Sequence, residues 1–144
     1  MAIGDCSIRR YWLKLLFNHG FHLPSIVHPS AWVSPSATVG YGTVIFANSV
    51  VQAQANIGHG AILNTACSLD HDVTIGHSVH ICPGARIAGD VNIGNSSTIG
   101  IGASVINRIR IGDDVTVGAG AVVISDLTDG VTAVGVPARV LGSK

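Results

Sequence analysis

Histidines are the side chains of this 144-residue chain best suited to proton transfer near neutral pH, and there are seven of them. One of them, His71, stands between two carboxylates, Asp70 and Asp72. A carboxylate beside an imidazole can orient the ring and make it more basic, so that it takes a proton from an amine or hydroxyl substrate. The residues alone leave a second interpretation open, a surface-turn histidine beside solvated aspartates. Three further histidines lie nearby in the sequence: His59, His77 and His80.

The three cysteines do not indicate a comparable chemistry. Cys6, Cys67 and Cys82 are odd in number and lack CxxC spacing, which is typical of reduced thiols in a cytoplasmic protein rather than of a disulfide or zinc framework. We reject Cys82 as a nucleophile because no neighbour in the sequence would activate its thiol. Cys67 falls at a position that is predicted to be buried.

Charge and hydropathy narrow the classes of partner. Eight Lys and Arg balance eight Asp and Glu, so the formal net charge is zero and a nucleic-acid partner is not expected. Hydrophobic residues make up 47% of the chain, yet no stretch approaches the roughly 18 apolar residues of a membrane helix. The first residues show no signal-peptide pattern, so we expect a cytoplasmic protein with no membrane partner.

A six-residue repeat must position these side chains. From Val27 to Val123 an aliphatic residue recurs at every sixth position, seventeen times without a phase slip, and a small or apolar residue follows four positions after each. Six residues are too few for a strand, a return helix and another strand, so each unit is one short strand ending in a bend. Three units close a triangle. The sequence therefore predicts an all-β, triangular parallel β-helix over residues 27–128.

Glycines support this winding. They recur eighteen residues apart, which is three units, and we expect them to mark one corner where a positive φ is needed: Gly40, Gly58, Gly76, Gly94 and Gly112. The same spacing stacks His59 and His77 on one edge. It places His71 on a different edge, at a bend beneath Gly89 of the next coil.

The segments on either side of the repeat have other patterns. Five residues form one apolar face of a short predicted helix, which begins after Ser7 as N-cap and stops at residues 18–20: Ile8, Tyr11, Trp12, Leu15 and Leu16. Residues 129–144 form a turn-rich tail that we expect to cover the open end of the core. A strand prism has no internal cavity, so chemistry must occur on an outer face or between chains. The apolar composition favours association of several copies. A closed three-fold ring would create three equivalent clefts between neighbouring prisms.

These residues also resemble a known family, the bacterial hexapeptide-repeat sugar O- and N-acetyltransferases of the sialic acid and UDP-4-amino-sugar (bacillosamine) type. The resemblance covers nearly the whole chain from Ile3 onward. It implies a left-handed β-helix, a homotrimer with active sites between subunits, acetyl-CoA as co-substrate, no metal, and a sugar or nucleotide-sugar acceptor. Its motifs are Asn64-Thr65, His71-Asp72, Ile75-Gly76, His80, Pro83-Gly84-Ala85, Ala88-Gly89, Ile93-Gly94 and Gly135-Val136-Pro137-Ala138-Arg139.

The resemblance also implies roles for individual residues. His71 is the general base, and Asp72, which follows it, orients the ring. The family often has Glu there, one methylene longer, so Asp70 remains an alternative partner. His80 contacts acetyl-CoA, and the main-chain N–H of Gly89 receives the thioester carbonyl oxygen. Asn64 is a substrate-binding residue, and the candidates for the CoA phosphates are Arg108, Arg110, Arg139 and Lys144.

The N-terminal segment departs from the family pattern. Residues 1–26 resemble only the last strand and helix of the small βαβ subdomain that binds the sugar nucleotide in the family. The glycine-rich phosphate loop of that subdomain is not found in the sequence. We therefore expect poor affinity for a nucleotide-sugar acceptor, or a different acceptor.

Two other functions compete with the acetyltransferase. The γ-type carbonic anhydrases are also trimeric left-handed prisms, but they bind zinc through a His-x4-His pair, and no two histidines here are five residues apart. The alternative from another class is a non-catalytic β-helix assembly module that has lost its acceptor-binding part.

Overall fold

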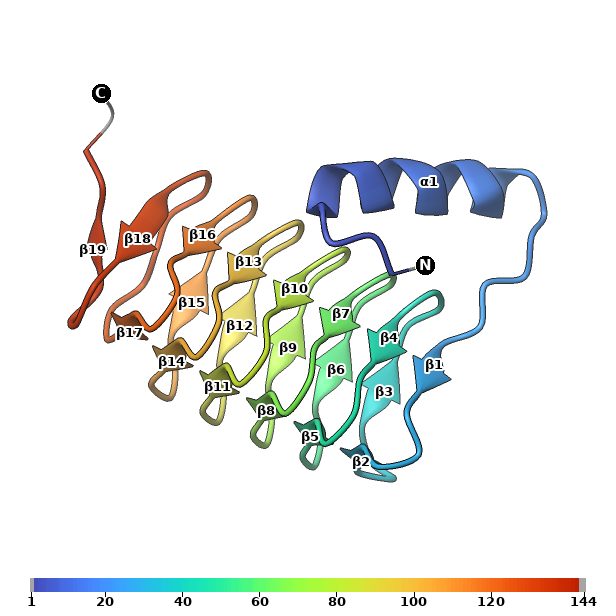
Figure 1. Cartoon of the computed structure of the whole chain (residues 1–144), viewed down its shortest axis with the longest axis horizontal. Coiled ribbons are helices and arrows are strands. Elements are labelled where there is room, and N and C mark those ends of the chain that lie inside the picture. The colour runs from blue at the N-terminus through green and yellow to red at the C-terminus, as the bar shows by residue number, and fades with distance from the viewer. Residues whose placement is uncertain (1, 143–144) are drawn as a thin grey trace.

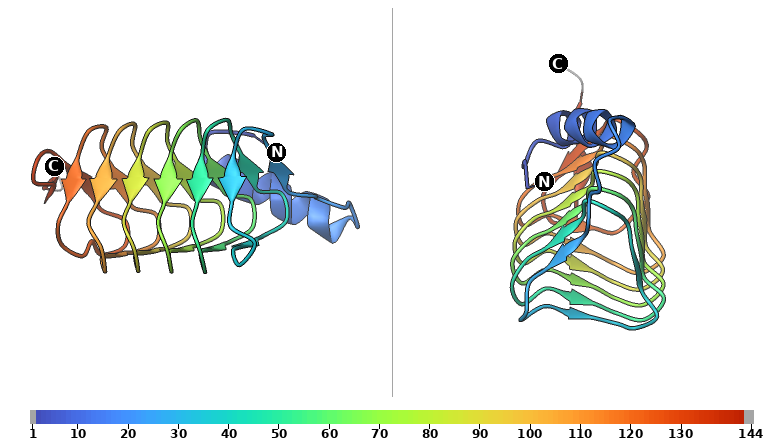
Figure 2. Two further views of the ribbon diagram at one scale, coloured as in Figure 1. Left: turned by 90° about the horizontal axis from the view of Figure 1, so that it is seen from below. Right: turned by 90° about the vertical axis from the view of Figure 1, so that its right-hand side faces the viewer.

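Residues 2–142 are described by a computed structural model, in which one helix precedes a left-handed parallel β-helix (Figure 1). The helix is α1 (Cys6–Asn18). Each coil contributes one short strand to each of three sheets, which gives the triangular section in Figure 2. The predicted left-handed β-helix with one N-terminal helix is therefore confirmed. Within the described residues, no helix has the length and apolar character needed to cross a membrane.

The three sheets are named here A, B and C in the order in which the chain first visits them. Sheet A contains β1 (Ile26–Val27), β4 (Val44–Ile45), β7 (Ile62–Leu63), β10 (His80–Ile81), β13 (Thr98–Ile99), β16 (Thr116–Val117), β18 (Thr132–Val134) and β19 (Arg139–Val140). Sheet B contains β2 (Trp32–Val33), β5 (Val50–Val51), β8 (Ser68–Leu69), β11 (Arg86–Ile87), β14 (Ser104–Val105) and β17 (Val122–Val123). Sheet C contains β3 (Thr38–Val39), β6 (Asn56–Ile57), β9 (Thr74–Ile75), β12 (Asn92–Ile93) and β15 (Arg110–Ile111).

The register of the strands determines which residues become neighbours. Parallel pairing joins each residue to the residue eighteen positions later, for example His80 to Thr98 and Asn92 to Arg110. At the C-terminal end the offset falls to sixteen, as in Thr116 with Thr132. A side chain at a bend therefore lies beside the residue eighteen positions away, in the next coil.

The core is built from the two positions that the sequence predicts to face inward. From Ile45 to Val123 the large aliphatic residues are buried, and the small residues between them are buried too. Three buried residues at the small inward position, the first of them just before Ile45, carry hydroxyl groups. Each hydroxyl donates to a backbone carbonyl fifteen residues ahead: Thr43 to Gly58, Ser49 to Asn64 and Ser97 to Gly112. Val27 is an exception to the prediction, because β1 begins the stack and has a neighbouring strand, β4, on one side alone, so its side chain is exposed.

The glycines spaced eighteen apart do mark one corner, but the predicted reason is wrong. The φ of Gly58 is not positive, and the same holds for its counterparts in the other coils. A Cβ on Gly58 would instead lie 2.6 Å from the backbone of Gly76 in the next coil. Close stacking of the coils is what requires glycine here. The left-handed conformation occurs two residues later, at Gly60 and at Ser78.

Helix α1 differs from the prediction at its start and in the face that it buries. Its N-cap is Asp5, whose Oδ1 accepts the N–H of Ile8 at 2.8 Å, and not Ser7. Cys6, Arg9 and Leu13 face the prism, whereas the predicted apolar face is largely exposed, including Tyr11 and Trp12. Arg9 explains the rotation of the helix, because its guanidinium donates to backbone carbonyls of two coils.

Candidate active site

His71 lies on the edge where sheet B turns into sheet C, in the bend between β8 and β9. Two local features form this bend. The Oδ1 of Asp70 accepts the backbone N–H of His71 at 2.8 Å, and Asp72 adopts a left-handed conformation with a φ of 60°. Aspartate is one of the few residue types that tolerate this conformation at low cost. The sequence Asp-His-Asp thus holds the imidazole outside the core.

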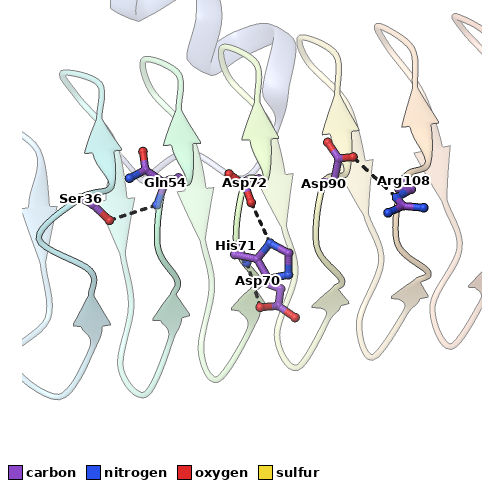
Figure 3. Close-up of polar contacts among 7 residues, drawn as sticks. All are labelled: Ser36, Gln54, Asp70, His71, Asp72, Asp90 and Arg108. Atoms are coloured by element: carbon purple, nitrogen blue, oxygen red, sulfur yellow. Dashed lines mark hydrogen bonds and ion pairs between the residues drawn. The ribbon is translucent and has the colours of Figure 1, made fainter.

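The imidazole of His71 is paired with Asp72. Its Nδ1 lies 2.8 Å from Oδ2 of Asp72, as the dashed line in Figure 3 shows. A carboxylate accepts hydrogen bonds, so Nδ1 carries the proton and Nε2 is left with a lone pair. The structure thus places Asp72, not Asp70, against the ring. The left-handed backbone at position 72 brings its short side chain back to the imidazole, while Asp70 holds the main chain.

The surroundings of His71 favour its protonated form. The hydrogen bond that His71 donates to Asp72 raises the pKa of His71 above its usual value. Desolvation opposes this increase, and the negative charges of Asp70 and Asp90 add to it. The ring remains 62% exposed. It can therefore meet a substrate and exchange its proton with solvent.

Replacing Asp72 by asparagine tests this pairing. An asparagine tolerates the same backbone conformation but carries no charge, so in Asp72→Asn we expect the pKa of His71 to fall towards its usual value. Because a base acts when unprotonated, the acidic limb of the activity–pH profile should move to lower pH. The pKa is measured by NMR titration of the His71 Cε1–H signal. An unchanged pKa in Asp72→Asn would contradict the assignment.

Gly89 provides the space that the His71 ring occupies. A Cβ at position 89 would lie 2.7 Å from both Cε1 and Nε2 of His71. The predicted placement of His71 beneath Gly89 is therefore confirmed in geometry. Within residues 2–142, the backbone N–H of Gly89 makes no backbone hydrogen bond, although its carbonyl accepts from Arg108. A free N–H donor thus lies beside the imidazole.

Replacing Gly89 by alanine should displace the His71 ring without unfolding the chain. The added methyl group would collide with a side chain that is free to swing into solvent, so we expect a kcat about 10²-fold lower and a nearly unchanged Tm. Steady-state kinetics measure kcat, and thermal unfolding measures Tm. Gly4→Ala is the matched control, because a Cβ there meets nothing within 4 Å. A Gly89→Ala enzyme with full activity would show that the ring need not lie in this position.

A shallow hollow of about 670 Å³ surrounds the pair. Asp90 and Arg108 form its far side, with Arg108 Nε 4.0 Å from Asp90 Oδ2. In Figure 3 they follow Asp72 along one edge, one coil apart. Asp90 is not among the residues predicted for the site, although its position eighteen residues after Asp72 places it there. The hollow is lined by Asp70, His71, Asp72, Ala88, Gly89, Asp90, Asn107 and Arg108.

Two predicted site residues, Asn64 and His80, lie elsewhere on the chain. Asn64 follows β7 on the edge between sheets A and B, and its Nδ2 lies 3.2 Å from Nε2 of His80. Burial and the nearby charge of Arg9 lower the pKa of His80 below its usual value. His80 is therefore a neutral, half-buried ring, and neither residue lines the hollow that contains His71.

The cationic candidates for the CoA phosphates are also dispersed. Arg108 lines the hollow around His71, whereas Arg139 in β19 donates to the carbonyl of Ala138 and Arg110 lies in β15 of sheet C. Lys144 lies outside the described residues. The fold of a single chain thus brings together His71, Asp72, Gly89 and Arg108 and leaves the remaining candidates apart.

Neither Cys67 nor Cys82 nor a cluster of metal-ligating side chains offers a second reactive centre among residues 2–142. Burial raises the pKa of the Cys67 thiol to about 11, and burial also raises that of Cys82. Both groups are therefore held in the protonated, unreactive form. Among residues 2–142, no three His, Cys, Asp or Glu side chains gather as they would around a metal ion.

Several solved structures are similar over almost the whole chain. The acetyltransferase domain of PglB from Neisseria gonorrhoeae has a TM-score of 0.96 and 45% identity, over 97% of this chain and 68% of its own. GDP-perosamine N-acetyltransferase from Caulobacter crescentus has a TM-score of 0.97 and 42% identity, over 99% of this chain and 68% of its own. WeeI from Acinetobacter baumannii has a TM-score of 0.93 and 29% identity, over 97% of this chain and 68% of its own. No protein-family model matches the chain, and no curated protein is significantly similar to it.

Some of these similar structures contain bound ligands that indicate the reaction of those proteins. The PglB domain has been solved with acetyl coenzyme A, and the perosamine enzyme with CoA and GDP-perosamine. The left-handed winding and the similarity to solved acetyltransferases place the chain among the hexapeptide-repeat acetyltransferases. More narrowly, the chain belongs to the family of sugar N-acetyltransferases within that class, and it is an acetyl-CoA-dependent acetyltransferase.

Proposed function

We propose that the chain transfers the acetyl group of acetyl-CoA to the amine of a nucleotide-linked amino sugar, with His71 as general base. The His71–Asp72 pair beside the free N–H of Gly89 is the observation that carries this proposal. The solved perosamine enzymes support it, since two of them are variants in which one histidine is replaced by alanine or asparagine. The three free cysteines agree with a cytoplasmic location, where thiols stay reduced.

In this mechanism the proton follows a short route. Nε2 of His71 takes a proton from the acceptor amine as the nitrogen attacks the thioester carbonyl. Asp72 keeps the other ring proton on Nδ1 and stabilises the imidazolium that forms. The N–H of Gly89 donates to the carbonyl oxygen while that oxygen carries negative charge. The amide bond forms and the C–S bond breaks. His71 returns its proton to the sulfur, so CoA leaves as the thiol.

We place the complete site between protomers of a homotrimer. His71 lies on the B/C edge of one prism, whereas Asn64 and His80 lie on its A/B edge and on sheet A. One acceptor meets both groups if the second edge belongs to a neighbouring copy. A closed three-fold ring repeats this contact three times.

The substrate is tested by a panel of acceptors. Release of the CoA thiol is measured with UDP- and GDP-linked 4-amino sugars and with the corresponding 4-hydroxy sugars. Turnover of an amino sugar alone supports the proposal. Turnover of the hydroxy sugars instead would mean O-acetylation, and no turnover of any acceptor would favour a non-catalytic assembly module.

The shared site is tested by mixing two inactive variants. His71→Ala and Asn64→Ala protomers, co-assembled at equal amounts, should restore about a quarter of the sites, because half of the bases and half of the partner edges are intact. Analytical ultracentrifugation gives the oligomeric state. Mixed assemblies that stay inactive would contradict a site between protomers.

A further inference from the structure

A column of stacked rings runs along the edge between sheets C and A, away from His71. The rings of Tyr41 and His59 are 3.7 Å apart, and those of His59 and His77 are 4.8 Å apart and nearly parallel. Phe17 of helix α1 stacks on the outer face of Tyr41 at 5.0 Å. Because the ring faces cover one another, the column presents ring edges rather than faces.

Backbone hydrogen bonds determine where these histidines carry their protons. Nδ1 of His59 accepts the N–H of Tyr41 at 3.1 Å, and Nδ1 of His77 accepts the N–H of His59 at 3.0 Å. A ring nitrogen that accepts carries no hydrogen, so in both neutral rings the proton is on Nε2. Each ring thus has one free donor, and it points away from the backbone.

Helix α1 forms the other wall of a groove over this column. The groove, of about 200 Å³, is lined by Arg10, Lys14 and Phe17 of the helix and by Tyr41, His59 and His77 of the prism. Among the residues that the structure describes, no carboxylate lines it. Nη1 of Arg10 donates to Ser96 Oγ at 3.1 Å, which steadies the guanidinium at the rim.

One acidic residue lies near these cations. Asp114 lines a neighbouring hollow together with Arg10 and Lys14. Within the described part of the chain it makes no ion pair with either of them. The two cations therefore remain available to a ligand in the groove.

We propose that this groove binds a phosphate or diphosphate group. Arg10, Lys14 and the two imidazole N–H groups are donors, two of them charged, and together they match the acceptor oxygens of a phosphate. The volume suits a phosphate or diphosphate group, because it lies below the roughly 300 Å³ at which pockets for drug-sized ligands begin. The group belongs to either the nucleotide of the acceptor or CoA. The choice between these two sources rests on the proposed function, whereas binding of the phosphate group itself is measured without turnover.

Titration with inorganic pyrophosphate, followed by calorimetry and by the Nε2–H signals of His59 and His77, tests the proposal. We expect the Kd to rise at least about tenfold in Lys14→Gln and in Arg10→Gln, with the two imidazole signals shifting in the wild type. Arg86→Gln is the matched control, because it removes one exposed cation from sheet B. An unchanged Kd in Lys14→Gln, or an equal loss in Arg86→Gln, would overturn the site.

Competition identifies the source of the phosphate. Displacement of pyrophosphate by UDP or GDP but not by CoA assigns the groove to the acceptor nucleotide. Displacement by CoA but not by UDP or GDP assigns it to the coenzyme. If no nucleotide displaces it, the pyrophosphate is an adventitious ion only and the proposal fails.

Discussion

Replacing His71 by alanine is expected to lower kcat by about 10²–10⁴-fold, which is the usual contribution of a general base. The variant keeps the bend, because the backbone N–H of residue 71, which donates to Asp70 Oδ1, is present whatever the side chain at position 71. The side chain is largely exposed and packs little of the core, so the Tm should be nearly unchanged. Release of the CoA thiol at saturating acceptor measures kcat.

The pH dependence of the activity distinguishes the loss of a general base from other causes of a lower kcat. Activity of the wild type should fall as the pH decreases through the pKa of His71, which lies above the usual value for histidine because Asp72 accepts from the ring. His71→Ala should lose this limb, and its residual rate should rise towards alkaline pH, where more of the acceptor amine is unprotonated. His22→Ala, which removes an exposed histidine of the segment after α1, serves as the control. A His71→Ala enzyme that keeps both its rate and its acidic limb would exclude this residue as the base.

The repeat made most of the fold predictable, because a six-residue period leaves few alternatives for the inward positions. The register of eighteen then placed His71 beneath Gly89 without any knowledge of side-chain contacts. The partner of the ring was not predictable in this way. Its identity depends on a left-handed φ at position 72, and this conformation recurs in the structure at residues as different as Ala66 and Arg108.

Helix α1 shows why a local pattern can mislead. Ile8, Tyr11 and Trp12 form an apolar face by spacing, yet the face that meets the prism contains Arg9. The partners of Arg9 on the prism are carbonyls between 51 and 70 residues away in the sequence. Helical periodicity carries no information about acceptors so distant, and a buried arginine is rare enough that sequence reasoning assigns it to the surface.

Replacing Arg9 by alanine is expected to detach α1 from the prism. The guanidinium is fully buried, and it donates to Gly60 O at 2.7 Å and to Ser78 O at 2.6 Å. It also bonds Ile3 O and Gly4 O in the segment before the helix. Truncation would leave the buried carbonyls of Gly60 and Ser78 without their Arg9 donor, at a cost of about 3–5 kcal/mol to the docking of the helix.

Two measurements distinguish undocking of α1 from unfolding of the β-helix. Hydrogen exchange should accelerate in Cys6–Asn18, while strands such as β12, which α1 does not cover, stay protected. Loss of the nearby charge should also raise the pKa of His80, because Arg9 lowers it in the native protein. Lys14→Ala, which removes an exposed cation of the same helix, should do neither. Unchanged exchange in Arg9→Ala would mean that apolar contacts such as that of Leu13 hold the helix by themselves. If the pKa of His80 rises in Arg9→Ala while the rate of acetyl transfer stays the same, catalysis does not depend on the docking of α1.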